Sequence, residues 1–143
     1  MKRILVIAGI ALATMMLDAP ALAANEDGVC NASSTAVGEF CLAYHSMEYP
    51  TGKGSIWDLS FVSGPEYNYN QPVQRVFQTP NQDGFGQSIN DNAASARNAY
   101  VGATVNLFSE VHYLGTVERV YTGPWHTLPS NIKNLGSSHN WTE

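Results

Sequence analysis

The sequence predicts an all-β sandwich, on three observations. Helical periodicity is nearly absent after the N-terminal segment. Short stretches of alternating apolar residues recur instead, separated by clusters of Gly, Pro, Asn and Ser, which is typical of strands joined by turns. The chain has only 143 residues, which fits one small domain and excludes a barrel enzyme or a two-domain dinucleotide-binding protein.

The first residues are predicted to be a secretory signal peptide. Lys2 and Arg3 precede an apolar run over 4–17, and Ala21-Leu22-Ala23 supplies small residues before a cleavage point. This run is too short to span a bilayer. We therefore expect residues 1–23 to be removed, leaving 24–143 as a secreted, soluble domain. The formal charge of the whole chain is −5, without a basic cluster, which argues against nucleic acid or an anionic membrane as a partner.

Four stretches carry the alternation expected of strands. In the first two, Phe40, Leu42 and Tyr44 alternate with Cys41 and Ala43, and Trp57, Leu59 and Phe61 alternate with Asp58 and Ser60. The third runs from Val101 to Leu107, and the fourth from Val117 to Tyr121 is more polar and predicted to be half exposed.

Cys30 and Cys41 are the two cysteines of the chain. In a small exported domain such a pair is expected to form a disulfide, which would pin the N-terminal arm to the first strand. A metal pair and a catalytic thiol are the alternatives, but no further Cys or His stands nearby at ligand spacing.

An internal repeat organises these strands. Phe108, Tyr113 and Gly115 form one spaced set of two aromatic residues and a glycine, and Tyr44, Tyr49 and Gly52 form a similar one. An Asn/Ser segment follows each set, at 91–96 and at 133–138. The repeat predicts two similar units whose apolar sides are buried against each other.

This pattern resembles the βγ-crystallin domain, a sandwich of two Greek-key motifs. Within that superfamily the chain is most similar to the Streptomyces-type secreted metalloproteinase inhibitors, over residues 29–140. The supporting stretches are Gly38-Glu39-Phe40-Cys41-Leu42, the run from Asn90 to Asn98, and Leu107-Phe108 continuing to Tyr113-Leu114-Gly115. The resemblance implies one domain with units at about 29–98 and 99–140. It also implies a non-catalytic, monomeric inhibitor that inserts a loop into the cleft of an extracellular metallopeptidase.

The first unit contains a long connection that is the candidate contact loop. Tyr49 lies 42 positions before Asp91, whereas Tyr113 lies 20 before Lys133. Loops rich in Tyr and Asn gain contact area at a low entropic cost. Inhibitors of this family have a second disulfide that this chain lacks, so prolines would have to stiffen the loop. The candidate contact residues are Pro65, Glu66, Tyr67, Asn68, Tyr69, Asn70 and Pro72.

The Asn/Ser segments are calcium-binding turns in many βγ-crystallin domains. The resemblance places Asp91, Asn92 and Ser95 in one turn and Asn134, Ser137 and Ser138 in the other. Such turns supply the oxygen ligands that calcium prefers. Ala96 lacks the second hydroxyl of the motif, and Lys133 brings a cation to it. The alternative is a structural role in which Asp91 caps a helical turn over 92–97.

No catalytic or zinc motif was found in the sequence. The four histidines (His45, His112, His126 and His139) are scattered, and Asp58, Glu66 and Asp83 are acids that a glycosidase-like pair would need to bring together. We therefore expect no enzyme and no required cofactor, with calcium as a possible ligand. Besides the inhibitor, the alternatives are a structural or weakly calcium-binding βγ-crystallin module and an antimicrobial or killer-toxin-like protein.

Overall fold

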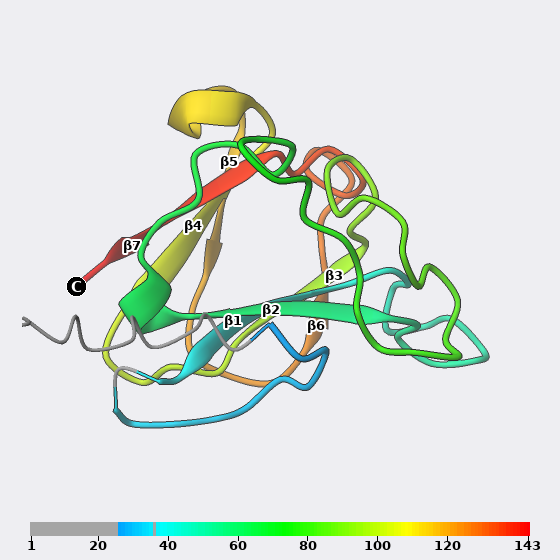
Figure 1. The fold of residues 1–143 in the computed structure, drawn as a ribbon. Coiled ribbons are helices and arrows are strands. Elements are labelled where there is room, and N and C mark those ends of the chain that lie inside the picture. The colour runs from blue at the N-terminus through cyan, green and yellow to red at the C-terminus, as the bar shows by residue number, and fades with distance from the viewer. Residues whose placement is uncertain (1–25, 36) are drawn as a thin grey trace, which may run out of the picture.

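Two antiparallel sheets packed face to face make up the part of the chain that the computed structural model describes, residues 26–35 and 37–143 (Figure 1). The first sheet has the strand order β2-β1-β3-β6 and the second has the order β5-β4-β7. The elements are β1 (Glu39–Ala43), β2 (Ile56–Ser60), the 3-10 helix η1 (Phe61–Ser63), β3 (Ser95–Asn98), β4 (Thr104–Phe108), the 3-10 helix η2 (Val111–Tyr113), β5 (Val117–Val120), β6 (His126–Thr127) and β7 (Ser138–Thr142).

The two halves of the chain exchange segments between the sheets, as Greek-key units do. β6 follows β5 in the chain but pairs with β3 in the first sheet. Conversely, Glu66 of the first half bridges His139 of β7 in the second sheet, through two backbone hydrogen bonds of 3.0 and 2.8 Å. The predicted all-β sandwich is therefore confirmed.

Aromatic and aliphatic side chains from both sheets form one core. Phe40 and Trp57 are fully buried and meet edge to face at 6.5 Å, and Val105 and Leu107 reach the same cluster from β4. β4 shows the expected alternation of buried and half-buried residues. In β5 the inward residue is Val120, while Val117 and the residue after the strand, Tyr121, are exposed.

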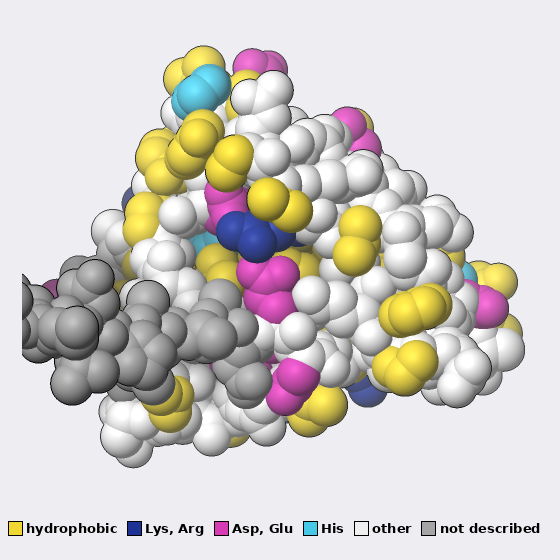
Figure 2. Space-filling model, viewed as in Figure 1, with side chains coloured by type: hydrophobic (Ala, Val, Ile, Leu, Met, Phe, Trp, Pro, Cys, Tyr) yellow, Lys and Arg dark blue, Asp and Glu magenta, His cyan; other side chains and the backbone are white. Residues whose placement is uncertain are grey.

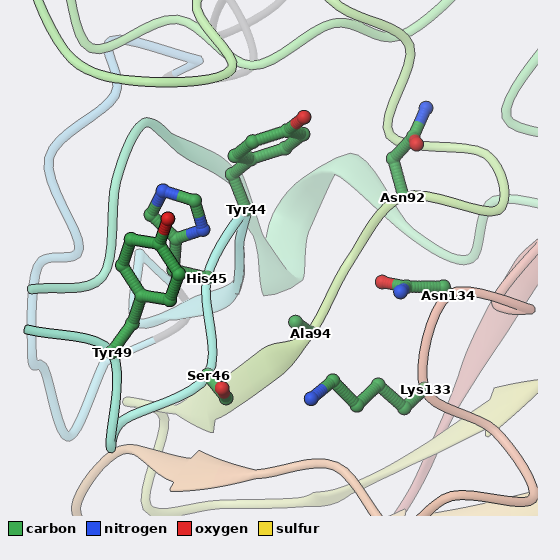
Figure 3. A pocket seen from close by; sticks show the side chains of 8 residues that line it. All are labelled: Tyr44, His45, Ser46, Tyr49, Asn92, Ala94, Lys133 and Asn134. Atoms are coloured by element: carbon green, nitrogen blue, oxygen red, sulfur yellow. The ribbon is translucent and has the colours of Figure 1, made fainter.

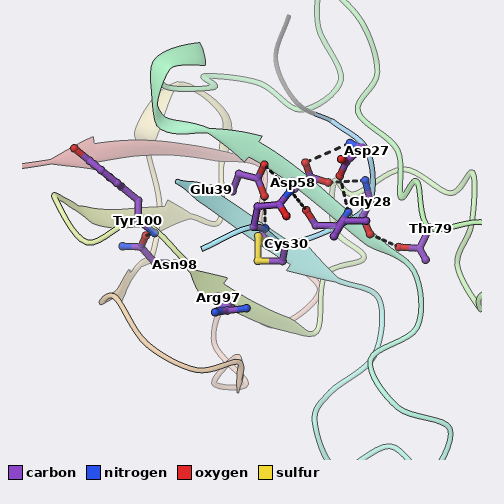
Figure 4. Close-up of a disulfide and its surroundings, with 12 residues drawn as sticks. Asp27, Gly28, Cys30, Glu39, Asp58, Thr79, Arg97, Asn98 and Tyr100 are labelled. Carbon is purple, nitrogen blue, oxygen red and sulfur yellow. Dashed lines mark hydrogen bonds between the residues drawn. A yellow bond between two sulfur atoms is a disulfide. The ribbon is translucent and has the colours of Figure 1, made fainter. Parts of the chain in front are cut away.

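β1 departs from simple alternation because both of its faces are covered. Phe40 and Leu42 face the core, whereas Glu39 and Cys41 lie under the N-terminal arm. The disulfide between Cys30 and Cys41 is formed, as expected (Figure 4). It pins the arm to β1.

A buried carboxylate fixes the arm a second time. Asp58 of β2 accepts hydrogen bonds from the backbone N–H groups of Gly28 at 2.6 Å and Asp27 at 3.3 Å. Burial, and then the neighbouring charge of Glu39, raise the pKa of Asp58 to about 7.

The predicted signal peptide, 1–23, lies outside the described residues. Among the described residues no helix is long and apolar enough to cross a membrane.

The two predicted hairpins occupy equivalent places. Tyr44 N–H donates to the carbonyl of Ser55, and Ser109 N–H donates to that of Thr116. Gly54 and Gly115 each precede these acceptors with φ of +72° and +77°.

The glycine that matches Gly115 is therefore Gly54, not Gly52, which also has a positive φ but no heavy atom near its missing Cβ. The predicted pairing of Tyr44 with Phe108 is shifted by one residue for the same reason, since Tyr44 matches Ser109. Phe108 and Tyr113 do contact each other, with ring centroids 5.7 Å apart. Tyr49 instead stacks on His45.

Candidate functional site

The two Asn/Ser turns pair with each other around a pseudo-twofold axis. Asp91 N–H donates to the carbonyl of Gly136 at 3.1 Å, and Asn134 N–H donates to that of Ala93 at 2.8 Å. Asp91 and Asn134 both have left-handed backbone, with φ of +61° and +57°. Asn and Asp tolerate this conformation better than most residues. Asp91 and Asn134 are therefore equivalent positions.

Two buried serines attach these turns to the hairpins. Ser95 Oγ donates to the carbonyl of His45 at 2.7 Å, and Ser138 Oγ donates to that of Glu110 at 2.6 Å. Both serine residues are fully buried. These hydroxyls are structural, because each has a backbone carbonyl as its partner.

This symmetry corrects the sequence alignment of the turns by one residue. The first turn begins at Asn90, so Asp91 matches Asn134 rather than Lys133, and Ala94 matches Ser137. The predicted helical turn over 92–97 is also wrong, because β3 begins at Ser95. Pairing of residues 95–98 with β1 outweighs the local preference of Asp91 to cap a helical turn. The Asn90-Asp91 pair was the signal in the sequence for the correct register.

Of the six predicted calcium ligands, the structure brings two side chains together in a suitable way. Asp91 Oδ1 lies 3.3 Å from Ser137 Oγ on the opposite turn. Asn92 instead donates its amide to the carbonyl of Ser88. Asp91 and Ser137 thus bring two side-chain oxygens from opposite turns together, and oxygens are the ligands that hard cations such as calcium take.

The equivalent position on the other side of the axis does not fit a cation. At this position Ala94 is equivalent to Ser137 and lacks its hydroxyl, and Asn134 is equivalent to Asp91 and has an amide in place of the carboxylate. The ammonium group of Lys133 points into a cavity of about 270 Å³ at this place (Figure 3). Its lining residues are Tyr44, His45, Ser46, Tyr49, Asn92, Ala94, Lys133 and Asn134.

The histidines lie in unrelated surroundings. His45 Nε2 pairs with Asp83 at 3.2 Å, and His112 is exposed and stacks on Tyr67. His139 is fully buried, and burial, together with the charge of Arg75, lowers its pKa to about 3. Within 26–35 and 37–143 no group of three His, Cys, Asp or Glu side chains could hold a metal ion. The acids Asp58, Glu66 and Asp83 do not form a catalytic pair, because each has a different partner. Asp58 accepts hydrogen bonds from the N-terminal arm, Glu66 binds Arg75, and Asp83 pairs with His45.

The candidate contact loop is only partly available to a partner. Glu66 is 6% exposed and Tyr69 is fully buried. Their prediction as contact residues is wrong, because the segment supplies the strand-like partner of β7. Tyr69 OH lies 3.1 Å from His139 Nδ1 inside the core.

Among the predicted contact residues Pro65 and Tyr67 are exposed, and the longest exposed stretch of this connection is residues 70–74, which contains Asn70 and Pro72. Arg75 N–H donates to the carbonyl of Tyr69 at 2.7 Å and closes the loop. The guanidinium of Arg75 contacts Glu66 at 2.7 Å and Glu26 at 2.8 Å. Figure 2 shows this face, where a basic group lies between acidic ones. Val73 and Gln74 were missed as candidate residues because the sequence does not reveal which residues anchor the loop.

Together, the two sheets, which exchange segments between the halves of the chain, and the paired turns define a βγ-crystallin-like domain. A solved structure described as "Evolution of the eye lens beta-gamma-crystallin domain fold" is similar to this chain with a TM-score of 0.51 and 18% sequence identity. The match covers 78% of this chain and 92% of that one. No protein-family model and no curated protein matches the chain. The chain thus has the βγ-crystallin fold.

Proposed function

We propose that this protein is a secreted, non-catalytic inhibitor of an extracellular metallopeptidase, and that residues 70–74 are its contact loop. The observation that supports this proposal most is the clamping of these five exposed residues between two fixed anchors. Tyr69 is buried before the loop, and Arg75 is held by two carboxylates after it. The family resemblance of the sequence points to the same activity.

Hydrogen bonds from outside the loop also hold its first residue, Asn70. Asn68 Oδ1 accepts the N–H of Asn70 at 2.9 Å, and Asn70 Oδ1 accepts the hydroxyl of Ser88 at 3.2 Å. A loop that is ordered before binding loses less conformational entropy in a protease cleft. In the proposed inhibitor these bonds, together with Pro72 in the loop, take the place of the family's second disulfide. Val73, 62% exposed, offers an apolar side chain at the tip.

Inhibition of a thermolysin-type metallopeptidase by the purified protein tests the proposal. We expect inhibition that weakens at least about tenfold in Val73→Glu, since a charge would have to enter an apolar contact. Val101→Glu is the matched control, because Val101 is similarly exposed, at 66%, but lies on the β3–β4 connection. If the native protein leaves several metallopeptidases uninhibited at micromolar concentration, the proposal is wrong.

The contact between Asp91 and Ser137 favours a second candidate function, a βγ-crystallin module stabilised by weak calcium binding. Calorimetric titration of calcium into the native protein and into Asp91→Asn separates this function from inhibition. Heat that disappears in the variant would support the calcium module. A native protein without binding heat would leave Asp91 with a structural role.

A further inference from the structure

The two sides of the pseudo-twofold axis have opposite charge. On one side stand Asn90, Asp91 and the hydroxyl of Ser137, and Asn90 Nδ2 donates to Asp91 Oδ2 at 2.7 Å. On the other side the equivalent residues are Lys133, Asn134 and Ala94. The backbone frame is shared, since both turns use the same pair of hydrogen bonds. Three side-chain differences therefore turn a place for a cation into a place for an anion.

Lys133 is available for a ligand in this second place. It is half-buried, and within the described part of the chain no carboxylate lies within 4 Å of its ammonium group. Lys133 acts only weakly on Glu48, because the pKa of Glu48 is lowered mainly by its hydrogen bond to Thr127, with Lys133 the weakest cause. Figure 3 shows the Lys133 ammonium and the Asn134 amide directed into the same cavity.

The rest of the lining suits a hydroxylated ligand. Asn92 also lines the cavity, but its amide is directed away from Lys133 (Figure 3), and its Nδ2 donates to the carbonyl of Ser88. Ser46 contributes a hydroxyl on the side of the cavity facing Lys133 (Figure 3). One wall is aromatic, because His45 and Tyr49 stack with centroids 3.8 Å apart and an interplanar angle of 15°. An apolar wall with a few convergent polar groups is typical of small-molecule sites.

We propose that this cavity, the Lys133 pocket, binds a small hydroxylated carboxylate of the sugar-acid class. The carboxylate would receive a charge-assisted hydrogen bond from Lys133 and a second one from the Asn134 amide. A hydroxyl group of the ligand would contact Ser46. This pocket is separate from residues 70–74. Whether or not it binds the ligand therefore has no bearing on the proposed inhibition.

Heteronuclear NMR titration of the purified protein tests the pocket, with sodium glucuronate, glucose and acetate as probes. We expect glucuronate at millimolar concentration to shift the Asn134 side-chain amide and the backbone signals of Lys133 and Ser46 saturably. Acetate should shift the same signals with lower affinity, and glucose should leave them unchanged. Lys133→Met should weaken glucuronate binding about tenfold, the effect of one charge-assisted hydrogen bond.

Lys53→Met is the matched control, because the Lys53 ammonium lies over the ring of Trp125 at 5.6 Å. It should bind glucuronate as the native protein does. The spectrum of Lys133→Met without ligand shows directly whether the variant is folded. The proposal is overturned if glucuronate shifts no pocket signal, if glucose acts as strongly as glucuronate, or if Lys133→Met binds unchanged.

Discussion

Single polar atoms decide how the turns and hairpins are joined. Ser95 and Ser138 are fully buried and each donates one short hydrogen bond to a hairpin carbonyl. Their role could not be predicted from the motif alone, since the motif residues also provide metal ligands in related domains. Which role a hydroxyl plays depends on a partner that lies 50 residues away for Ser95 and 28 for Ser138.

Ser95→Ala should lower the free energy of unfolding by about 1 kcal/mol, because the hydrogen bond from this fully buried side chain to the carbonyl of His45 is lost. Ser138→Ala should act in the same way on the carbonyl of Glu110. The measurement is urea unfolding followed by tryptophan fluorescence. Ser137→Ala is the control with a smaller loss, since its hydroxyl makes only long bonds of 3.3 and 3.4 Å. Equal losses in all three variants would contradict the structural role.

Asp58 should make stability depend on pH. Its pKa is about 7 in the folded state, because of burial and then Glu39, against about 3.9 in the unfolded chain. Between about pH 4 and pH 7, Asp58 therefore binds more protons in the folded protein than in the unfolded chain. The contribution of Asp58 is therefore complete below about pH 4 and is lost as the pH rises through 7, by at most about 1.4 kcal/mol per pH unit.

Urea unfolding of the native protein and Asp58→Asn over this range measures the effect. The free energy of unfolding of the native protein should fall relative to the variant as the pH rises. Parallel curves for the two proteins would show that Asp58 does not titrate in this window.

Among the elements, the strands were predicted best where only one face is covered. β4 alternates as its sequence does, because its outer residues face solvent. β1 and β2 also formed where expected, yet Glu39 and Asp58 proved buried. The cysteine pair predicted that the N-terminal arm would be pinned to β1, but nothing in the sequence indicated that Glu39 and Asp58 would accept hydrogen bonds from its backbone N–H groups. β3 was missed for a related reason, since Ser95-Ala96-Arg97-Asn98 has little strand propensity and depends on pairing with β1.

The long connection packs against the first hairpin through a glycine. A Cβ at Gly84 would lie 2.3 Å from Cγ of Tyr44, and φ is +87°. Gly86 has a similar φ of +77° but no heavy atom within 4 Å. Gly84→Ala should therefore lose about 1–3 kcal/mol more than Gly86→Ala, because only the first adds a steric clash to the backbone strain. Thermal unfolding of the two variants measures the difference, and equal losses would mean that Tyr44 moves aside freely.

At the scale of the whole molecule, the duplication was predictable and its register was not. Two spaced sets of aromatic residues and glycine predicted the two units, although the structure matches Tyr44 with Ser109 and Gly54 with Gly115. The alignment of the turns was one residue wrong because Asp91 and Asn92 are both acceptable at the second motif position. Only the reciprocal hydrogen bonds between Asp91 and Gly136 and between Asn134 and Ala93 fix it.

The corrected register predicts how to convert one side of the axis into the other. The variant Ala94→Ser, Lys133→Asn, Asn134→Asp gives the Lys133 pocket the same donors that surround Asp91. Oxygen ligands on the shared backbone frame should then bind a hard cation. Terbium luminescence sensitised by tyrosine is the measurement, since Tyr44 and Tyr49 line this pocket.

The triple variant should show stronger terbium emission than the native protein, and calcium should displace the ion. Asp91→Asn in the native background should reduce the native emission, which identifies the contribution of the first side. The triple variant with Asp91→Asn added should keep the new emission, because its site lies across the axis. If the three substitutions leave emission unchanged, the equivalence of Asp91 with Asn134 does not extend to ligand binding, and the contrast in charge would not explain what each side accepts.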